Sequence, residues 1–412
     1  MNDVPKYREI LPEIQEAIII DRQNHRENPF KCQNSQVIRR NQTKDIQSIL
    51  RPSFLRDAEK ILHLPTYNRY TDKTQVFSFF HNDDISRRAL HVQIVSQIAR
   101  SIGSVLGLNS DLIEAISLGH DLGHTPFGHV GEKYLSAILE REIGEYFNHN
   151  VHSVRVLEYI FKRNVSLQTL DGILCHNGEF EQQEYKPRTI DYNLSSEDLF
   201  KEFDTQIENC NKNGNAAIKK LVPITLEACV VRICDMIAYL GKDRQDAITA
   251  KIIQDTGCFS TNELGTINAE IINNLSVDII NNSYGKNYIY LSPEYYQALK
   301  TAKKENYDLI YFNPLLTKET DTYLQPMMEE LYYALLDEFL KAKKESYLWQ
   351  HHINYIQFHT QYYCSRDYAE ETEPHKLVAD YIASMSDDYF IEIYKKMFPN
   401  KKVKIAYKTY FD

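Results

Sequence analysis

The stretch from Gly119 to Glu132 concentrates the residue types that carry out chemistry in proteins. It reads Gly-His-Asp-Leu-Gly-His-Thr-Pro-Phe-Gly-His-Val-Gly-Glu, so three histidines, one aspartate and one glutamate stand among small and apolar residues. The adjacent His120 and Asp121 offer one imidazole nitrogen and one carboxylate oxygen, a mixed set that divalent metals accept. Cysteine is absent from the stretch. A structural zinc site built from thiolates is therefore not expected.

A metal ion needs ligands that converge from separate elements, and the sequence supplies candidates on both sides of this stretch. Seven of the 14 histidines lie between residues 91 and 176. His91, His120, Asp121 and Asp235 each fall at or near a helical position on a face that can turn inward. Two nitrogens and two carboxylates leave room for water and a substrate oxygen on a six-coordinate ion. The alternative is that both histidines are core residues and that Asp121 caps a helix.

Helical periodicity predicts how the first ligands are positioned. Between residues 90 and 106 apolar side chains recur every three or four positions, and His91 shares their inward face. A capping sequence at residues 109–111 begins a second helix, whose inward face ends at His120. The metal-type pair is therefore expected at the end of a helix.

The loop that follows is set by residues that break helices. Two glycines and a proline fall between residues 123 and 128, so His124 and His129 are expected on a loop. The next helix is predicted to begin near Gly131–Glu132 and to run towards Ile143.

Later segments are also mainly helical in pattern. Residues 226–248 form a predicted helix with one apolar face, and a second stripe carries Asp235, Tyr239 and Asp243 every four residues, as the wall of a site would. The polar residues 177–215 are expected to form loop with short helices. Alternation typical of strands is limited to residues 286–291 and 403–407. The fold class is therefore predicted to be all-α, with at most a small strand element.

Bulk composition limits the class of protein. The 412 residues are 43% hydrophobic and carry a formal net charge of −10, which indicates a large core and argues against a general nucleic-acid coat. The seven cysteines show no CxxC spacing, which favours reduced thiols in a cytoplasmic protein. No apolar run approaches the roughly 20 residues that cross a bilayer. Three regions are expected: an N-terminal extension (1–50), a core that carries the site (51–260) and a C-terminal helical region (261–412).

Many motifs in this chain occur in a familiar order. They are Arg51 to His63, Tyr67 to Phe77, Arg88 to His91, the stretch 119–132, Phe147 to Ser153, Cys234 to Tyr239 with Asp243 and Asp246, Leu299–Lys300 with Ile310–Tyr311, and Asp380 to Tyr389. Together they cover most of the chain from about residue 50 to 398. The sequence resembles the HD-domain superfamily and, more closely, the deoxyguanosine triphosphate triphosphohydrolases within it.

The resemblance implies a role for each candidate residue. The metal ligands would be His91, His120, Asp121 and Asp235. His129 and Glu132 would handle protons, with His124 and His149 beside the phosphates. Gln75, Tyr239 and Asp243 would read the deoxyribose, and Arg88 would bind phosphate or, as the alternative, form a structural salt bridge. His81, His176, His351 and His352 have no assigned chemistry, and surface or core packing is expected for them.

The implied activity is metal-dependent hydrolysis of a deoxynucleoside triphosphate, with dGTP expected, at the α-phosphorus to deoxynucleoside and tripolyphosphate. One divalent ion per subunit is implied, and the ligand set accepts Mn, Mg, Fe, Ni, Co or Zn. A homo-oligomer and an activating nucleotide are implied as well. Two alternatives stay open. One is another HD phosphohydrolase, acting on nucleoside monophosphates, cyclic dinucleotides or guanosine polyphosphates. The other is a nucleotide-sensing or single-strand-binding HD protein, to which lysine-rich segments such as 341–344 would contribute.

Overall fold

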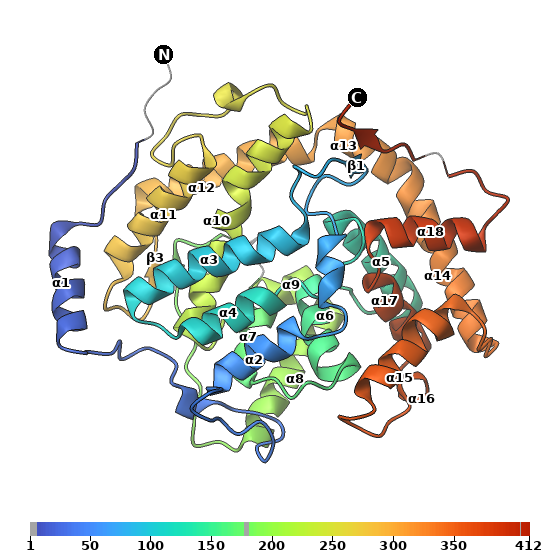
Figure 1. The fold of residues 1–412 in the computed structure, drawn as a ribbon, viewed down its shortest axis with the longest axis horizontal. Coiled ribbons are helices and arrows are strands. Elements are labelled where there is room, and N and C mark those ends of the chain that lie inside the picture. The colour runs from blue at the N-terminus through green and yellow to red at the C-terminus, as the bar shows by residue number, and fades with distance from the viewer. Residues whose placement is uncertain (1–5, 177–180, 404) are drawn as a thin grey trace.

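The computed structural model describes residues 6–176, 181–403 and 405–412. Its architecture is helical, so the all-α prediction is confirmed (Figure 1). The strands among the described residues are two-residue pieces: β1 (Phe80–His81) pairs in parallel with β4 (Lys408–Thr409), and β2 (Glu184–Tyr185) pairs antiparallel with β3 (Ile289–Tyr290). No helix in the described part of the chain is long and apolar enough to cross a membrane.

Three helices form the centre of the molecule: α3 (Arg88–Leu106), α4 (Ser110–Gly119) and α10 (Leu226–Thr249), which pack on one another (Figure 1). Other helices are α1 (Pro12–Gln23), α2 (Ser53–Leu62), α5 (Gly128–Ile143), α6 (His149–Arg155), α7 (Leu167–Leu174), α8 (Ser196–Asn213), α9 (Asn215–Ile218), α11 (Asn268–Ser283), α12 (Pro293–Asn306), α13 (Pro314–Glu319), α14 (Gln325–Leu340), α15 (Asn354–Thr360), α16 (Tyr368–Glu371), α17 (Pro374–Ala383) and α18 (Asp387–Met397). On one side of this centre, α14, α17 and α18 lie beside α5.

The junction between α3 and α4 shows how local sequence fixes the centre. The side chain of Asn109 accepts hydrogen bonds from the backbone of Asp111 and Leu112, which caps α4 at its N-terminus. The helices approach so closely at Gly103 that a Cβ there would lie 2.2 Å from Cδ1 of Ile113. A larger residue at position 103 would require the Ile113 side chain to move. The predicted helices at 90–106 and 111–120 are therefore present within two residues of their expected bounds.

The start of α5 differs from the prediction. The helix begins at Gly128 rather than near Gly131, because Phe127 adopts a left-handed conformation with φ of 62° and turns the chain directly into the helix. The Phe127 N–H donates to Asp387 Oδ1 at 3.0 Å, and the Thr125 hydroxyl donates to the Gly128 carbonyl at 2.9 Å. The expectation that His129 lies on a loop is thus wrong, since it is in the first turn of α5.

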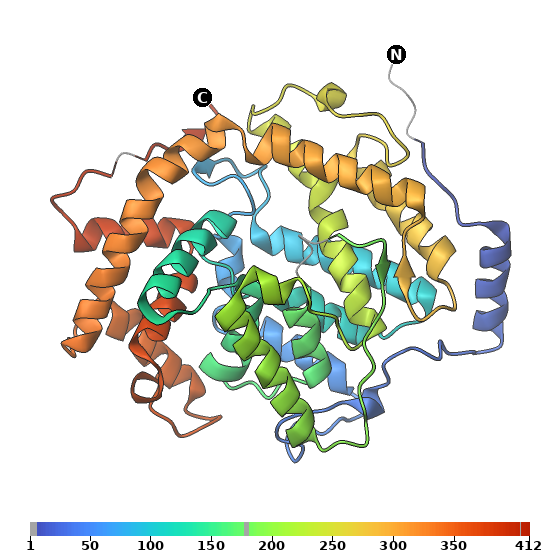
Figure 2. The ribbon, with the colours of Figure 1, turned by 180° about the vertical axis from the view of Figure 1, so that it is seen from behind.

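The polar stretch 177–215 also differs from the prediction. Residues 177–180 lie outside the described part. In the remainder of the stretch, α8 occupies 18 residues. Figure 2 shows this helix on the face turned towards the viewer. Ser195 caps it, and Leu199, Phe200 and Phe203 are buried. The strand expected at 286–291 is reduced to β3, and the one expected at 403–407 lies farther along, at β4. Residue 404 is outside the described part.

Candidate active site

The predicted metal ligands converge from three central helices. His91 lies in the first turn of α3, His120 and Asp121 follow α4, and Asp235 lies in α10. His91 Nε2 is 3.0 Å from Asp235 Oδ1 and 3.9 Å from Asp121 Oδ2. His120 Nε2 is 3.4 Å from Asp121 Oδ1 and 3.7 Å from Asp235 Oδ1. His91, His120 and Asp235 each place one ligand-type atom within 4.8 Å of the others, and Asp121 forms such a group with His120 and His176. A single cation held by His91, His120, Asp121 and Asp235 stays a prediction.

The protonation of these residues also suits a cation. His120 Nδ1 lies 2.6 Å from the Ser117 carbonyl, so this nitrogen carries the hydrogen and Nε2 presents a lone pair. His120 Nε2 is buried and makes no hydrogen bond to any described residue. For Asp235, burial by itself would raise the pKa, but the hydrogen bond with His91 and the neighbouring His120 outweigh it and lower the pKa to about 2. An ionised carboxylate and a bare imidazole nitrogen are what a divalent metal binds.

Arg88 contacts the candidate metal ligands through Asp121. Its guanidinium is buried, pairs with Asp121 Oδ2 and donates to the Thr74 carbonyl at 3.3 Å. The contacts match the salt bridge that was the alternative for this residue. Arg88 thereby orients a candidate metal ligand, and its contact with phosphate stays a prediction.

A second cluster adjoins the first through Asp121, whose Oδ1 is 3.4 Å from His124 Nε2. It contains His124, His129, Glu132 and His149, which each place one ligand-type atom within 4.8 Å of the others. The Glu132 carboxylate accepts from His129 Nδ1 at 3.1 Å, from His149 Nδ1 at 3.0 Å and from the His149 backbone at 2.7 Å.

These contacts fix the charge of Glu132 and the orientation of His129. Burial alone would raise the pKa of Glu132, but His149 and His129 outweigh it and hold the pKa well below its usual value. His129 is 57% exposed at its side chain, whereas Glu132 is 15% exposed. A largely buried anion therefore anchors an accessible imidazole, which is the arrangement that a general acid or base needs.

His176 lies among the candidate site residues, although surface or core packing was expected for it. Its Nε2 is 3.2 Å from His149 Nε2 and 3.9 Å from Asp121 Oδ1. Its Nδ1 faces the Ile173 carbonyl at 2.6 Å, as His120 faces Ser117, so Nε2 is the acceptor. His149 must then donate from Nε2 as well as from Nδ1, which makes it an imidazolium. Burial by itself lowers the pKa of His149, but the Glu132 carboxylate outweighs it and raises the pKa.

Of the residues expected to read the sugar, Tyr239 and Asp243 lie on α10, and Gln75 precedes α3 in the chain. Asp243 is buried two turns after Asp235 on α10 and accepts a hydrogen bond from the Tyr311 hydroxyl at 2.6 Å. Gln75 Oε1 is buried and receives no hydrogen bond from the described residues. A Cβ at Gly128 would lie 3.4 Å from the Gln75 carbonyl, so the segment that carries Gln75 touches the start of α5.

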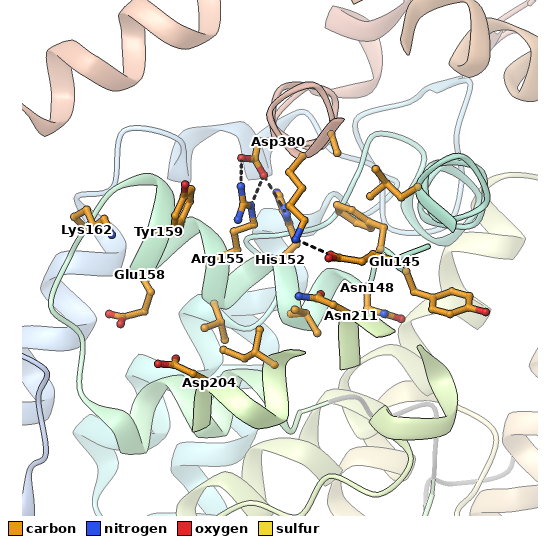
Figure 3. Close-up of a pocket in the computed structure, with 18 of the residues that line it drawn as sticks. Glu145, Asn148, His152, Arg155, Glu158, Tyr159, Lys162, Asp204, Asn211 and Asp380 are labelled. Carbon is orange, nitrogen blue, oxygen red and sulfur yellow. Dashed lines mark hydrogen bonds and ion pairs between the residues drawn. The ribbon is translucent and has the colours of Figure 1, made fainter. Parts of the chain in front are cut away.

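Two cavities lie next to the second cluster. One, of about 560 Å³, is lined by His129, Glu132 and His149. The other, of about 500 Å³, shares the segment 146–148 with the first and is lined by His152, Arg155 and Asp380 among others (Figure 3). The first cavity is the one that reaches the candidate acid–base pair.

Comparison with known proteins shows the family to which the chain is related. The HD domain family matches residues 88–240, and the family described as a phosphohydrolase-associated domain matches residues 289–396. A relative from Caldanaerobacter subterraneus is 31% identical over 355 residues, which cover 85% of this chain and 86% of the relative. One from Clostridium perfringens strain SM101 is 32% identical over 365 residues, with coverage of 86% and 89%.

Both relatives bear the name deoxyguanosinetriphosphate triphosphohydrolase-like protein. The match extends over most of the chain and includes both candidate clusters. The chain belongs to the HD-domain phosphohydrolase family and, within it, to the deoxyguanosinetriphosphate triphosphohydrolase-like proteins.

Proposed function

We propose that this protein hydrolyses deoxynucleoside triphosphates, with dGTP as the first substrate to test, at the α-phosphorus to deoxynucleoside and tripolyphosphate. The observation that carries the proposal is the adjacency of the two clusters. Asp121 belongs to the metal-type group, and its carboxylate is 3.4 Å from His124 in the acid–base group. The names of the relatives support the choice of substrate class.

His91, His120, Asp121 and Asp235 would hold one divalent cation, which is Mn, Mg, Fe, Ni, Co or Zn. A cation bound there supplies positive charge that polarises a phosphoryl group and lowers the pKa of water. Arg88 keeps Asp121 oriented. The imidazolium of His149, beside neutral His124, offers a positive charge that stabilises phosphate oxygens.

The reaction breaks the bond between the α-phosphorus and the 5′-oxygen and forms a bond from the phosphorus to a water oxygen. Glu132 accepts the Nδ1 hydrogen of His129, so His129 Nε2 is the atom that exchanges a proton. It accepts the proton of the attacking water or, as imidazolium, gives one to the leaving 5′-oxygen. Glu132 stays ionised throughout and stabilises the charged ring.

Selection of a deoxyribose is assigned to Gln75, Tyr239 and Asp243. A glutamine and an aspartate can hydrogen-bond the 3′-hydroxyl, and the unpaired Oε1 of Gln75 is one acceptor for it. A tyrosine ring packed under C2′ leaves no space for a 2′-hydroxyl. We further propose that the protein forms a homo-oligomer, that a second nucleotide activates it and that it is cytoplasmic. We also propose that the chain has three regions, with boundaries at residues 50 and 260.

The test is a panel of dNTPs with a divalent metal, each with and without a second nucleotide, and the products are separated by ion exchange. Deoxyguanosine and tripolyphosphate from dGTP are expected. Formation of dGMP and pyrophosphate, or no turnover of any dNTP, would contradict the proposal. His129→Ala is expected to abolish most of the turnover while bound metal is retained. Unchanged turnover in that variant would exclude His129 as the residue that transfers the proton.

A further inference from the structure

The C-terminal motif 380–389 carries two buried aspartates that are not among the candidate metal ligands. Asp387 is the first residue of α18. Its Oδ1 accepts from the Phe127 N–H at 3.0 Å, and its Oδ2 accepts from the Thr74 hydroxyl at 2.5 Å. One carboxylate from the end of the chain therefore joins two segments that border the candidate site.

The contact with Phe127 fixes the start of α5. A left-handed conformation is unfavourable for a residue with a side chain, so it persists only where its surroundings hold it. The Phe127 ring packs against Phe79 and Phe390, with ring centres 5.4 and 5.3 Å apart. His129 and Glu132 follow in the first turn of α5. The direction of this turn, and with it the placement of the acid–base pair, depends on the conformation of Phe127.

The contact with Thr74 is reinforced by its neighbour. Lys73 is buried, and its ammonium donates to the His124 carbonyl and, at 2.7 Å, to the Ala383 carbonyl at the end of α17. Gln75, the candidate sugar-binding residue, comes next in the chain. The turn between α17 and α18 thus holds the segment 73–75 and the loop after Asp121 together.

The same turn is anchored to α6 by the other aspartate. Arg155 makes two hydrogen bonds to Asp380, at 2.6 and 2.8 Å, and His152 Nδ1 lies 3.7 Å from the same carboxylate (Figure 3). Helix α6 begins at His149, which contacts Glu132. Asp387 is therefore held in place relative to both ends of the acid–base cluster.

We propose that Asp387 is a positioning residue for the reaction: acting through Phe127 and Thr74, it sets His129 and Glu132 against the bound nucleotide. The inference rests on the proposed function. It also gives the phosphohydrolase-associated region a role in the active site. The candidate metal ligands all lie in the HD region, and Asp387 in the associated region would help to position the acid–base pair.

The test compares Asp387→Ala with Asp387→Asn. Alanine removes both acceptors, and a displacement of the pair by about 1 Å is expected to lower kcat by about 10- to 100-fold with little change in KM. Asparagine retains an oxygen for the Phe127 N–H, and its amide can donate to the Thr74 hydroxyl, so kcat is expected to recover most of the loss. Asp388→Ala, at an exposed neighbour of the same charge, is the matched control and is expected to keep wild-type kcat. Thr74→Val, which removes one of the two hydrogen bonds, should give an intermediate kcat.

Two measurements separate positioning from general damage. Bound metal per subunit is expected to be the same in all variants, and hydrogen exchange without nucleotide is expected to accelerate at residues 124–130 in Asp387→Ala but not in Asp388→Ala. Equal losses in Asp387→Ala and Asp387→Asn, a loss confined to KM, or metal content that falls with kcat would overturn the inference. If the wild type hydrolyses no dNTP, the proposed function fails. The hydrogen-exchange measurement then still decides whether Asp387 stabilises residues 124–130. Unchanged exchange in Asp387→Ala would show that it does not.

Discussion

Asp243 offers a stability measurement that reports on the candidate sugar pocket without any substrate. Its carboxyl group is 2% exposed. Burial, with a smaller contribution from Asp246, raises its pKa from 3.8 to about 7 against the opposing effect of the Tyr311 hydrogen bond. The folded protein therefore keeps the proton up to about pH 7, whereas the unfolded chain releases it near pH 4. Stability is complete below the lower value and falls as the pH rises towards 7.

The size of the effect follows from linkage. Between the two pKa values the folded state loses about 1.4 kcal/mol per pH unit, or about 4 kcal/mol in all. Most of this, about 3 kcal/mol, is lost between pH 5 and pH 8. An unfolding entropy of about 2.1 cal/mol/K per residue gives roughly 0.9 kcal/mol/K for this chain. Asp243→Asn, which stays neutral and can still accept from Tyr311, should therefore gain about 3 °C in Tm relative to wild type between pH 5 and pH 8.

The assay is differential scanning calorimetry of both proteins at pH 5 and pH 8 after metal has been removed by a chelator, because a bound cation would favour the ionised carboxylate. Asp308→Asn, at an exposed aspartate near Tyr311 that pairs with Lys304, should show a pH-independent difference. If the Tm difference for Asp243→Asn is equal at the two pH values, the carboxyl group is ionised in the folded protein at both and the reasoning from burial is refuted.

Three further predictions concern the two histidine clusters. His120→Ala should weaken metal binding at least about tenfold, as measured by metal content after dialysis against a fixed free concentration. The exposed His81→Ala is its control, and equal metal content in the two would exclude His120 as a ligand. Glu132→Gln should keep its metal but lower kcat by roughly 100-fold or more in steady-state kinetics, because an amide cannot accept all three hydrogen bonds made to the carboxylate. His176→Asn should lower kcat about tenfold while the exposed His351→Asn does not, and a wild-type rate in His176→Asn would return that residue to simple core packing.

Local signals in the sequence explain which elements could be predicted. The helices α3, α4 and α10 carry strong apolar periodicity, and Asn109 marks the start of α4 with its own side chain. Because the face of a helix follows from spacing alone, His91 could be placed inward. The convergence of His91 with Asp235 to 3.0 Å needed the packing of α3 on α10, which no local pattern specifies; the family resemblance supplied that pairing as an expectation.

The elements that were not predicted depend on contacts between distant parts of the chain or on weak patterns. The buried face of α8 is narrow, and its polar majority resembled a loop. The start of α5 is set by a hydrogen bond from Phe127 to Asp387, far away in sequence. The sequence did contain a signal for His176, because it follows an apolar helix as His120 does. In the structure, the Nδ1 atoms of both histidines face a carbonyl three residues earlier.

The hydrogen bond between Phe127 and Asp387 has a consequence for the order of events during synthesis. A chain is made from its N-terminus, and its early parts begin to fold while later parts are still being added. All four candidate metal ligands have been made once Asp235 is added, long before Asp387. A growing chain can therefore gather its metal-binding side chains while the start of α5 still lacks its acceptor. The acid–base pair would then be the last part of the site to take its final place.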